Sequence, residues 1–402
     1  MVDTSSSLWL RAQAVGWRGL MGVGMYLHRL ASPRPPNYTF RRSIPSHFSS
    51  VAGNFLLYFY CPTSWRRRGQ GQKYPLVVNF HGGGFTIGNA CDDARWCDAV
   101  VSQVGAIVVS VDYRLAPEQP FPTAVKDGVE AILYLSEHAE ELGLDMNNFA
   151  VSGFSAGGNM AFSVPLRLHA EILASQKGRD ADTNSVYSGR EVPGEVAAGT
   201  LKAIVAWYPS VDFTRPRPER EAIPTRPDLM LPKFFTDLFD ASYLQPPTLD
   251  YSSPYLSPGV APPELLRELP DMIMMYPCEF DGLKVEAAAF RKRLEEEIGK
   301  TVRWREVEGV PHGWDKSPNP FRIPVKVDKY YKDACETLRI AFGMEPAWDG
   351  TEADVSVGVG MEQEQPDSFK RYEVDVMGFN EDKARHDIHQ QTEITTRSED
   401  LE

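Results

Sequence analysis

The segment Gly153-Phe154-Ser155-Ala156-Gly157 constrains this chain more than any other feature. It lies between an apolar, strand-like run at 148–151 and a helix-like run at 159–174. A serine with glycine two positions away on each side is typical of a sharp turn from strand to helix, because larger side chains would collide when the serine is raised above the sheet. The pattern also arises by chance in turns rich in Gly and Ser, so other segments must support it.

Two further segments supply that support. His81-Gly82-Gly83-Gly84-Phe85 lies upstream, directly after the strand-like run 75–80. Asp281 and His312 follow downstream of Ser155, in that order. A glycine loop followed by Ser, Asp and His along the chain is the arrangement of the α/β-hydrolases.

The rest of the chain predicts an α/β fold, because strand-like and helix-like runs alternate. We expect an α/β-hydrolase fold, with a mostly parallel central sheet, helices on both faces and a helical cap at about 215–263. The expected strands are 54–61, 74–80, 106–111, 148–151, 201–208, 272–276 and 301–307. The expected helices are 123–142, 159–174, 232–243, 283–298 and 324–342.

Composition divides the chain into three parts. Residues 1–45 are expected to form an N-terminal helical segment at the cap or entrance, and 46–346 the catalytic domain, with a polar insertion at about 175–200. The tail 347–402 is acidic and is expected to be disordered: residues 348–402 carry fifteen Asp or Glu against five Lys or Arg, out of a net charge of −13. The remaining body is near neutral, so we expect no nucleic-acid partner.

No metal site or disulfide framework is expected, because the five cysteines are scattered and none has the spacing of metal ligands. Residues 8–30 are apolar but contain arginines and glycines, so we expect neither a membrane span nor a signal peptide, and a cytoplasmic location. The favoured interpretation of this segment is an amphipathic helix on the active-site entrance. Peripheral contact with a membrane surface is the alternative, which the mixture of Trp9, Trp17, Arg11 and Arg18 allows. The sequence does not indicate an oligomeric state.

The candidate chemistry is that of an activated serine. Ser155 is the expected nucleophile and needs a base to take its proton, for which His312 in its Pro- and Gly-flanked loop is the candidate. Asp281 is expected to hold the imidazole in place. Glu279 and Asp315 compete for that role, but Glu279 comes two residues too early and Asp315 is too close to His312 along the chain.

Negative charge that develops on a carbonyl oxygen needs backbone N–H donors close by, and glycine allows that approach. The expected oxyanion-hole donors are Gly83, Gly84 and Ala156. A merely flexible loop is the plainer alternative, and a phosphate cradle is disfavoured because no Lys-Ser/Thr follows the glycines. This chemistry requires no cofactor. The expected substrate contacts are Phe85, Tyr208, Phe235 and Trp314.

These motifs, with Asp112-Tyr113-Arg114-Leu115-Ala116-Pro117-Glu118, resemble the hormone-sensitive-lipase-like branch of the α/β-hydrolases, which are serine esterases with an HGGG loop. The resemblance covers roughly residues 74–314 and implies that the 112–118 segment is structural. Gly282 follows the acid where the family commonly has Pro, and Trp314 stands where it commonly has Phe. The stretch through Pro45 looks similar to fungal members.

The expected function is therefore a serine carboxylic-ester hydrolase that acts through an acyl-enzyme on small to medium apolar or aromatic esters. The alternative is an acyltransferase or a lactone-forming or deacylating enzyme of secondary metabolism with the same triad, since the difference depends on how water is excluded. A ligand-binding protein on this scaffold is a third interpretation. It is disfavoured because such receptors lack the base, whereas every catalytic component is present here.

Overall fold

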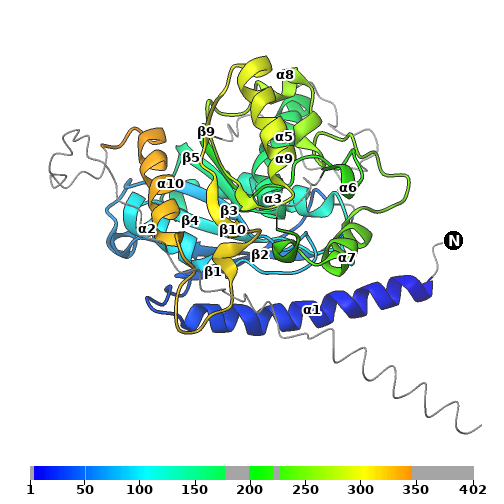
Figure 1. Cartoon of the computed structure of the whole chain (residues 1–402). Helices are drawn as coiled ribbons and strands as arrows, with labels where there is room; N and C mark the ends of the chain where they lie inside the picture. Colours follow the sequence, from blue (N-terminus) through cyan, green and yellow to red (C-terminus); the bar gives the residue numbers. More distant parts are fainter. Residues whose placement is uncertain (1–3, 50, 177–198, 221–225, 346–402) are drawn as a thin grey trace, which may run out of the picture. The chain divides into compact units, whose positions relative to one another are not determined.

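The computed structural model describes residues 4–49, 51–176, 199–220 and 226–345 (Figure 1). Eight strands form the central sheet in the order β1-β2-β4-β3-β5-β6-β7-β9. Its middle strands are apolar and buried on both faces, as strands of a parallel sheet are. The strands are β1 (Phe40–Pro45), β2 (Asn54–Tyr60), β3 (Tyr74–Phe80), β4 (Ile107–Asp112), β5 (Leu144–Phe154), β6 (Leu201–Trp207), β7 (Met272–Tyr276) and β9 (Thr301–Trp304).

The pairing confirms the predicted α/β-hydrolase fold. β2 is antiparallel to β1 and to β4, and every other neighbouring pair in the sheet is parallel. Parallel neighbours need crossover connections, which the helices supply. The carboxyl ends of the parallel strands therefore meet at one edge, where ligand sites of open α/β sheets form.

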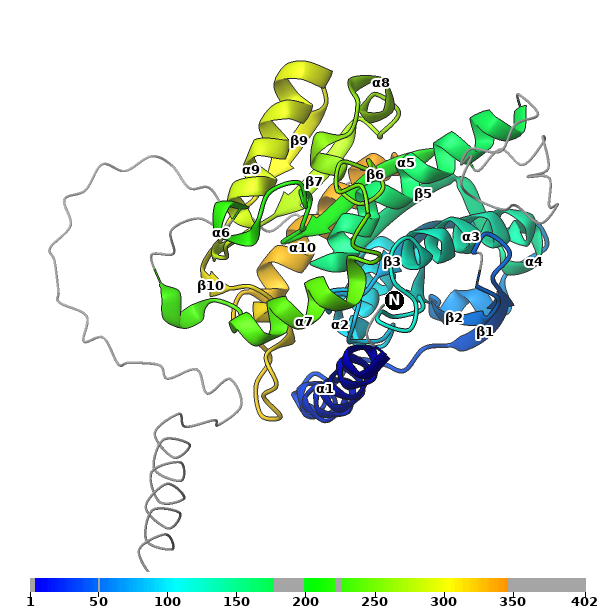
Figure 2. The same cartoon turned by 90° about the vertical axis from the view of Figure 1, so that its right-hand side faces the viewer.

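Helices cover both faces of the sheet (Figure 2). One hydrophobic cluster joins residues such as Val78 and Val109 to Phe162, and a second joins Val77 and Val108 to Trp96. Adjacent residues of one strand thus contribute to opposite clusters, as the alternation of side chains along a strand requires. The first face is covered by α3 (Thr123–Glu137), α5 (Ala156–Gln176) and α9 (Lys284–Arg293), and the second by α2 (Ala94–Val104) and α10 (Val327–Ala341).

Several predicted elements are divided in the structure. The single strand expected at 301–307 is two strands: β9 ends at Trp304, and β10 (Val307–Pro311) pairs with β8 (Cys278–Phe280) in a separate two-stranded sheet. The helix expected at 123–142 breaks at His138 into α3 and α4 (Ala139–Leu142). The helix expected at 283–298 is α9 (Lys284–Arg293) followed by a π-helical turn, η4 (Leu294–Ile298).

The cap expected at 215–263 contains short helices. They are α6 (Arg217–Arg220) and α7 (Lys233–Tyr243), whereas α8 (Pro263–Leu266) begins where the expected cap ends. Most of the expected polar insertion and all of the expected acidic tail lie outside the described residues.

The N-terminal segment is a long helix, α1 (Thr4–Leu30), which contacts α7 of the cap. Trp17 of α1 stacks on Phe234 of α7, with ring centroids 5.1 Å apart. Within the described part of the chain, no helix combines the length and the apolar character that crossing a bilayer requires.

Candidate active site

Ser155 lies in the turn between β5 and α5, where its backbone adopts a φ of 54°. Non-glycine residues rarely occupy this left-handed region, and such strain is typical of a nucleophile raised above a sheet. The turn is held by a hydrogen bond from the Ser155 N–H to the Trp207 carbonyl, 2.9 Å long. It also requires glycine at 157, because a β-carbon there would lie 2.0 Å from the Phe80 carbonyl oxygen.

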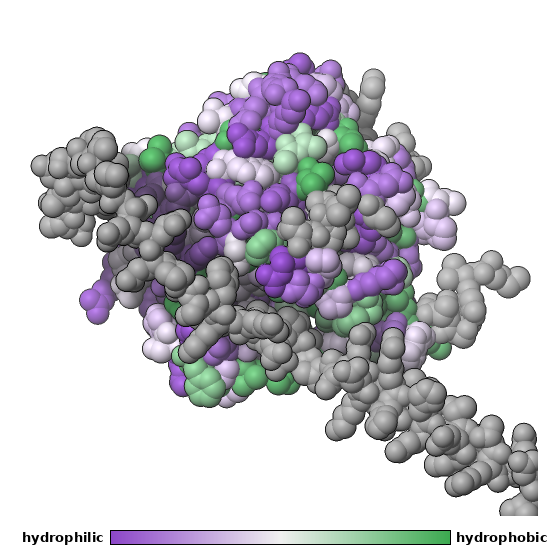
Figure 3. Space-filling model, in the orientation of Figure 1, coloured by the Kyte–Doolittle hydropathy of each residue, from purple (hydrophilic) through white to green (hydrophobic). Residues whose placement is uncertain are grey.

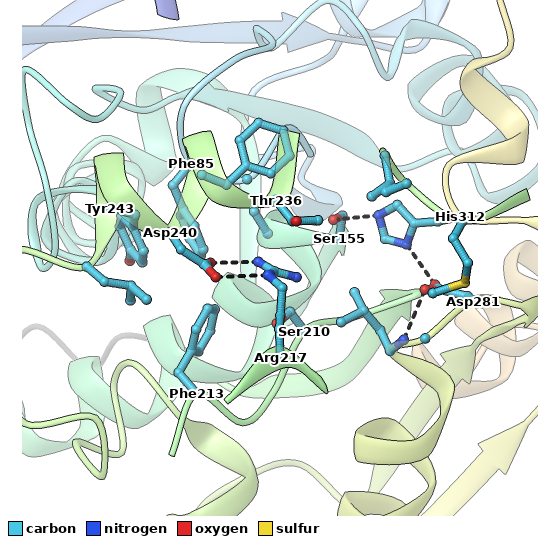
Figure 4. Close-up of a pocket in the computed structure, with 18 of the residues that line it drawn as sticks. Phe85, Ser155, Ser210, Phe213, Arg217, Thr236, Asp240, Tyr243, Asp281 and His312 are labelled. Atoms are coloured by element: carbon cyan, nitrogen blue, oxygen red, sulfur yellow. Dashed lines mark hydrogen bonds and ion pairs between the residues drawn. The ribbon is translucent and has the colours of Figure 1, made fainter. Parts of the chain in front are cut away.

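The structure brings Ser155, His312 and Asp281 together (Figure 4). The Ser155 hydroxyl lies 2.9 Å from His312 Nε2, and His312 Nδ1 lies 2.7 Å from Asp281 Oδ2. With the proton on Nδ1, the imidazole donates to the carboxylate and accepts from the serine. The three side chains come from separate loops, after β5, after β8 and after β10.

Asp281 is the acid that contacts His312, and the two competing acids are engaged elsewhere. Its other oxygen accepts the N–H of Leu283 at 3.0 Å, which fixes the carboxylate. Glu279 accepts the N–H of Gly309, and Asp315 accepts hydrogen bonds from two tyrosine hydroxyls. The arrangement can therefore orient the His312 ring and stabilise its protonated form.

Residues 81–88, called the glycine loop below, lie directly against the Ser155 turn. A β-carbon added at Gly82 would be 3.5 Å from the β-carbon of Ser155. Gly84 has a φ of 57°, and a β-carbon there would lie 2.2 Å from the Phe239 ring of the cap. Gly82 therefore lies against the serine turn and Gly84 against the cap, whereas the close neighbour of Gly83 is Ile87 of the same loop.

Arg18 of α1 reaches the glycine loop from outside the site. Its Nε donates to the Thr86 carbonyl at 2.8 Å, and its Nη2 donates to the Ala116 carbonyl at 2.7 Å. The Glu118 carboxylate holds the same guanidinium through an ion pair of 2.7 Å. Glu118 belongs to the 112–118 segment that the family resemblance implies is structural, and its partner is Arg18.

A cavity with an empty volume of about 700 Å³, part of it open to solvent, adjoins the triad. Of the expected oxyanion donors, Gly84 and Ala156 line it. Its other walls come mainly from the cap and from the Asp281 loop. Its lining residues include Phe85, Arg217, Leu231, Phe239, Asp240 and Tyr243.

The four expected substrate contacts have different places. Phe85 lines the cavity and stacks on Tyr243, with centroids 3.7 Å apart. Tyr208, Phe235 and Trp314 are not among the described residues that line it. Tyr208 lies behind His312, with ring centroids 4.8 Å apart, and Phe235 packs on Trp17. The indole of Trp314 donates to the Val325 carbonyl.

A buried ionic cluster lies beneath the triad. Lys316 Nζ lies 2.7 Å from Asp315, 2.9 Å from Asp93 and 3.6 Å from the ring centre of Phe154. The hydroxyls of Tyr208 and Tyr331 donate to Asp315. Although burial acts to raise the pKa of Asp315, Lys316 and the two hydroxyls hold it below its ordinary value. The cluster ties the His312 loop to the end of β5.

A strained serine above a parallel sheet, with His and Asp behind it, defines a hydrolase-type site. The chain belongs to the α/β hydrolase fold family, whose sequence pattern matches residues 77–316.

Similar proteins include several ester hydrolases. The chain is 33% identical to Lipase 2 of a Moraxella species over 249 residues, 59% of this chain and 54% of the relative. It is 32% identical to the carboxylic ester hydrolase LipN of Mycobacterium tuberculosis over 256 residues, 63% of this chain and 60% of LipN. The chain thus spans less than two thirds of the length of these relatives.

Solved structures agree with the fold. An esterase of Pyrobaculum calidifontis superposes with a TM-score of 0.61 and 26% identity, covering 81% of this chain and 92% of the esterase. An α/β hydrolase enzyme from the metagenome of Lake Arreo superposes with a TM-score of 0.63 and 25% identity, covering 83% of this chain and 92% of that enzyme.

Proposed function

We propose that this chain is a serine carboxylic-ester hydrolase that works through an acyl-enzyme. The observation that carries the proposal is the continuous hydrogen-bonded line from Ser155 Oγ through His312 to Asp281, with lengths of 2.9 and 2.7 Å. The ester-hydrolase names of the relatives support it. The substrate class is a small-molecule ester.

The proposed reaction begins when His312 Nε2 takes the Ser155 proton as the serine oxygen attacks the ester carbonyl. Asp281 stabilises the imidazolium that forms. The N–H groups of Gly83, Gly84 and Ala156 stabilise the tetrahedral oxyanion, and each such donor is worth about 2.7–4 kcal/mol of barrier. His312 then gives its proton to the leaving alcohol, and water attacks the acyl-enzyme with His312 again as base.

Within the family, we infer a hormone-sensitive-lipase-like enzyme of fungal type. The glycine loop beside Ser155 supports the branch, and a relative in Schizosaccharomyces pombe, 32% identical over 243 residues, supports the fungal kinship. The apolar walls formed by Phe85, Phe239 and Tyr243 favour apolar or aromatic esters of short to medium length over long-chain triglycerides. Acyl transfer to an alcohol or amine would use the same residues.

The test is labelling by a fluorophosphonate probe, which reacts with activated serines. We expect the intact chain to be labelled, Ser155→Ala to be unlabelled and His312→Ala to be labelled far more slowly. Ser102→Ala, which changes an exposed serine on α2, is the matched control and should label normally. Undiminished labelling of Ser155→Ala would refute the proposed nucleophile.

Products then separate hydrolysis from transfer. The intact chain, which reacts with the probe, is incubated with short-chain nitrophenyl esters in the presence and absence of added alcohols or amines. Free acid as the dominant product in both mixtures supports the hydrolase. If the acylated acceptor is instead the dominant product in water, the chain is an acyltransferase and the proposed hydrolase function is rejected.

A further inference from the structure

Helix α1 carries apolar side chains on two opposite faces. One face packs on the protein through Ala14, Trp17 and Met25. The opposite face, called the outer face of α1 below, consists of Leu8, Trp9, Val15, Val23 and Tyr26 and is exposed. Trp9, Val23 and Tyr26 have 66%, 58% and 64% of their surface in contact with solvent. A helix that only covered its own protein would carry polar residues there.

The loop at 317–326 adds a second exposed apolar element beside α1. His28 of α1 hydrogen-bonds through Nδ1 to the Ser317 carbonyl at 3.1 Å, which holds the loop against the helix. Phe321 of this loop is 90% exposed. Figures 1 and 2 both show the loop reaching down to α1. In Figure 3, apolar side chains are visible at the lower left of the molecule, where the carboxyl-terminal half of α1 lies in Figure 1.

The stretch of sequence that contains α1 carries positive charges only. Residues 4–91 contain nine Arg and one Lys but no Asp or Glu, although the whole chain is acidic. Arg11 and Arg34 are exposed beside the outer face of α1, and Arg322 is exposed next to Phe321. Apolar side chains with Trp and Tyr, flanked by arginine, are the composition of helices that lie in the interface of a membrane.

A groove beside Tyr26 adds a place for a negative group. Arg29 and Arg34 line it together with Asn37. The carboxylate of Asp92 also contributes, but it is 95% buried and is held by hydrogen bonds to Asn89. Two guanidinium groups at the edge of an apolar face match the phosphate and carboxylate of an anionic lipid headgroup.

The exposed apolar face could be covered by a second copy of this chain or by a lipid surface, and the charge around it distinguishes the two. In a symmetric dimer the same patch meets itself, so the arginines around it would face each other. An anionic lipid surface neutralises them instead. We propose that the outer face of α1, together with Phe321, docks this chain on an anionic phospholipid surface as a peripheral protein.

Partly exposed apolar side chains also lie between the packed side of α1 and the candidate site. Trp17 stacks on Phe234, which is half exposed, and the neighbouring Leu231 is partly exposed and lines the cavity that holds Ser155. An apolar ester dissolved in the lipid would therefore meet apolar side chains along its way to the serine. This delivery rests on the proposed function, whereas the docking itself does not.

The test is co-sedimentation of the full chain with vesicles of phosphatidylcholine alone or mixed with phosphatidylserine. We expect binding to the mixed vesicles that weakens as salt is raised, since exposed charges are screened. The double variant Val23→Gln, Phe321→Ser should lower the partition coefficient by about tenfold or more, because both side chains leave the lipid. The matched control, Ile340→Gln, removes a side chain of similar exposure on α10 and should bind as the parent does.

Binding equal to the parent in the double variant, or no binding to mixed vesicles, overturns the proposal. So does gel filtration in which the parent is a dimer and the double variant a monomer, because the face is then a self-interface. Hydrolysis of a water-soluble short ester by the parent and the double variant is measured in parallel. Intact hydrolysis without vesicle binding refutes the docking alone, and vesicle binding without hydrolysis refutes the proposed function alone.

Discussion

Arg18 on the first helix donates a hydrogen bond of 2.8 Å to the carbonyl of Thr86 in the glycine loop. The two residues are 68 positions apart in the chain. Thr86 in turn donates its N–H to Gly83 and its hydroxyl to Gly84. The backbone that faces Ser155 is thus held from behind by a residue of α1, which makes α1 part of the support of the site.

Replacing Arg18 by Met is expected to lower kcat with little change in KM. The substitution removes the bond to Thr86 and lets the glycine loop move, so its N–H groups stabilise the oxyanion less well, an interaction made only in the transition state. We expect a fall of about tenfold to a hundredfold, since removing one donor outright costs about 10²–10³. Steady-state kinetics on a soluble short-chain ester measures both parameters.

Two variants control this experiment. Arg18→Lys keeps the charge but lacks the planar fork that bridges two carbonyls and a carboxylate, so it should resemble Arg18→Met. Arg11→Met removes an exposed arginine of the same helix and should leave kcat unchanged. A loss in kcat shared by Arg11→Met would show that the charge of α1, and not the bond to Thr86, is responsible.

Replacing Lys316 by Met is expected to destabilise the fold strongly. Burial acts to lower the pKa of Lys316, but Asp315 and Asp93 raise it above its ordinary value, so the side chain is charged. Without it two buried carboxylates lose their cation, a change that costs about 3–5 kcal/mol of unfolding free energy. Urea unfolding measures the loss. Lys332→Met, an exposed lysine of α10, should change stability little, and an equal loss there would contradict the prediction.

The stability of the fold is expected to decrease as pH is lowered, because of His28. Burial, and then the charge of Lys316, lower the pKa of His28 from 6.5 to about 4. Below pH 6.5 the His28 imidazole therefore binds a proton in the unfolded chain, whereas in the folded chain it stays neutral until the pH reaches about 4. Stability is lost across this window as pH falls, by about 3 kcal/mol from this group.

The non-titrating variant His28→Asn isolates this contribution. Unfolding free energies of the parent and the variant are compared by urea titration between neutral pH and pH 4. The parent should lose about 3 kcal/mol more than the variant, because both share every other titrating group. Parallel curves for the two proteins would show that His28 is not the group responsible.

The elements around Ser155 are predictable from the sequence because their requirements are local. Glycine at 153 and 157 is needed within one turn. The short strands that Asp281 and His312 follow, β8 and β10, are not among the predicted strands, although the order of the two residues along the chain is informative. The strand β1 was not anticipated, and the break between β9 and β10 was missed. Residues 301–307 contain no Gly or Pro, and the break depends on which neighbouring strand each half pairs with.

Side-chain roles were harder to predict because they depend on distant partners. Tyr208 and Trp314 are aromatic residues near the motifs, so a pocket position was expected. Instead, the Tyr208 hydroxyl donates a hydrogen bond to Asp315, and the Trp314 indole N–H donates one to the Val325 carbonyl. These bonds hold both rings in the core. No pattern within α1 indicates that Arg18 would meet Glu118, a hundred positions away.

The ion pair of Arg217 and Asp240, which lines the cavity with Ser155, is expected to act in substrate selection (Figure 4). Arg217 Nε and Nη2 lie 2.8 and 2.6 Å from the two carboxylate oxygens. Asp240→Asn removes the negative charge and leaves the cavity more positive. Two opposite charges about 4 Å apart near a protein surface attract each other by about 4 kcal/mol. A substrate carboxylate in the cavity lies farther than that from the Arg217 guanidinium, so its attraction is smaller.

We therefore expect Asp240→Asn to favour esters that carry a carboxylate. The ratio of kcat/KM for such an ester to that for a neutral ester of the same size should rise about tenfold, which corresponds to about 1.4 kcal/mol. Asp237→Asn, one turn earlier on α7 and exposed, pairs with Lys233 and is the matched control. A ratio unchanged in Asp240→Asn, or raised equally in Asp237→Asn, would mean that the local charge of the cavity does not select the substrate.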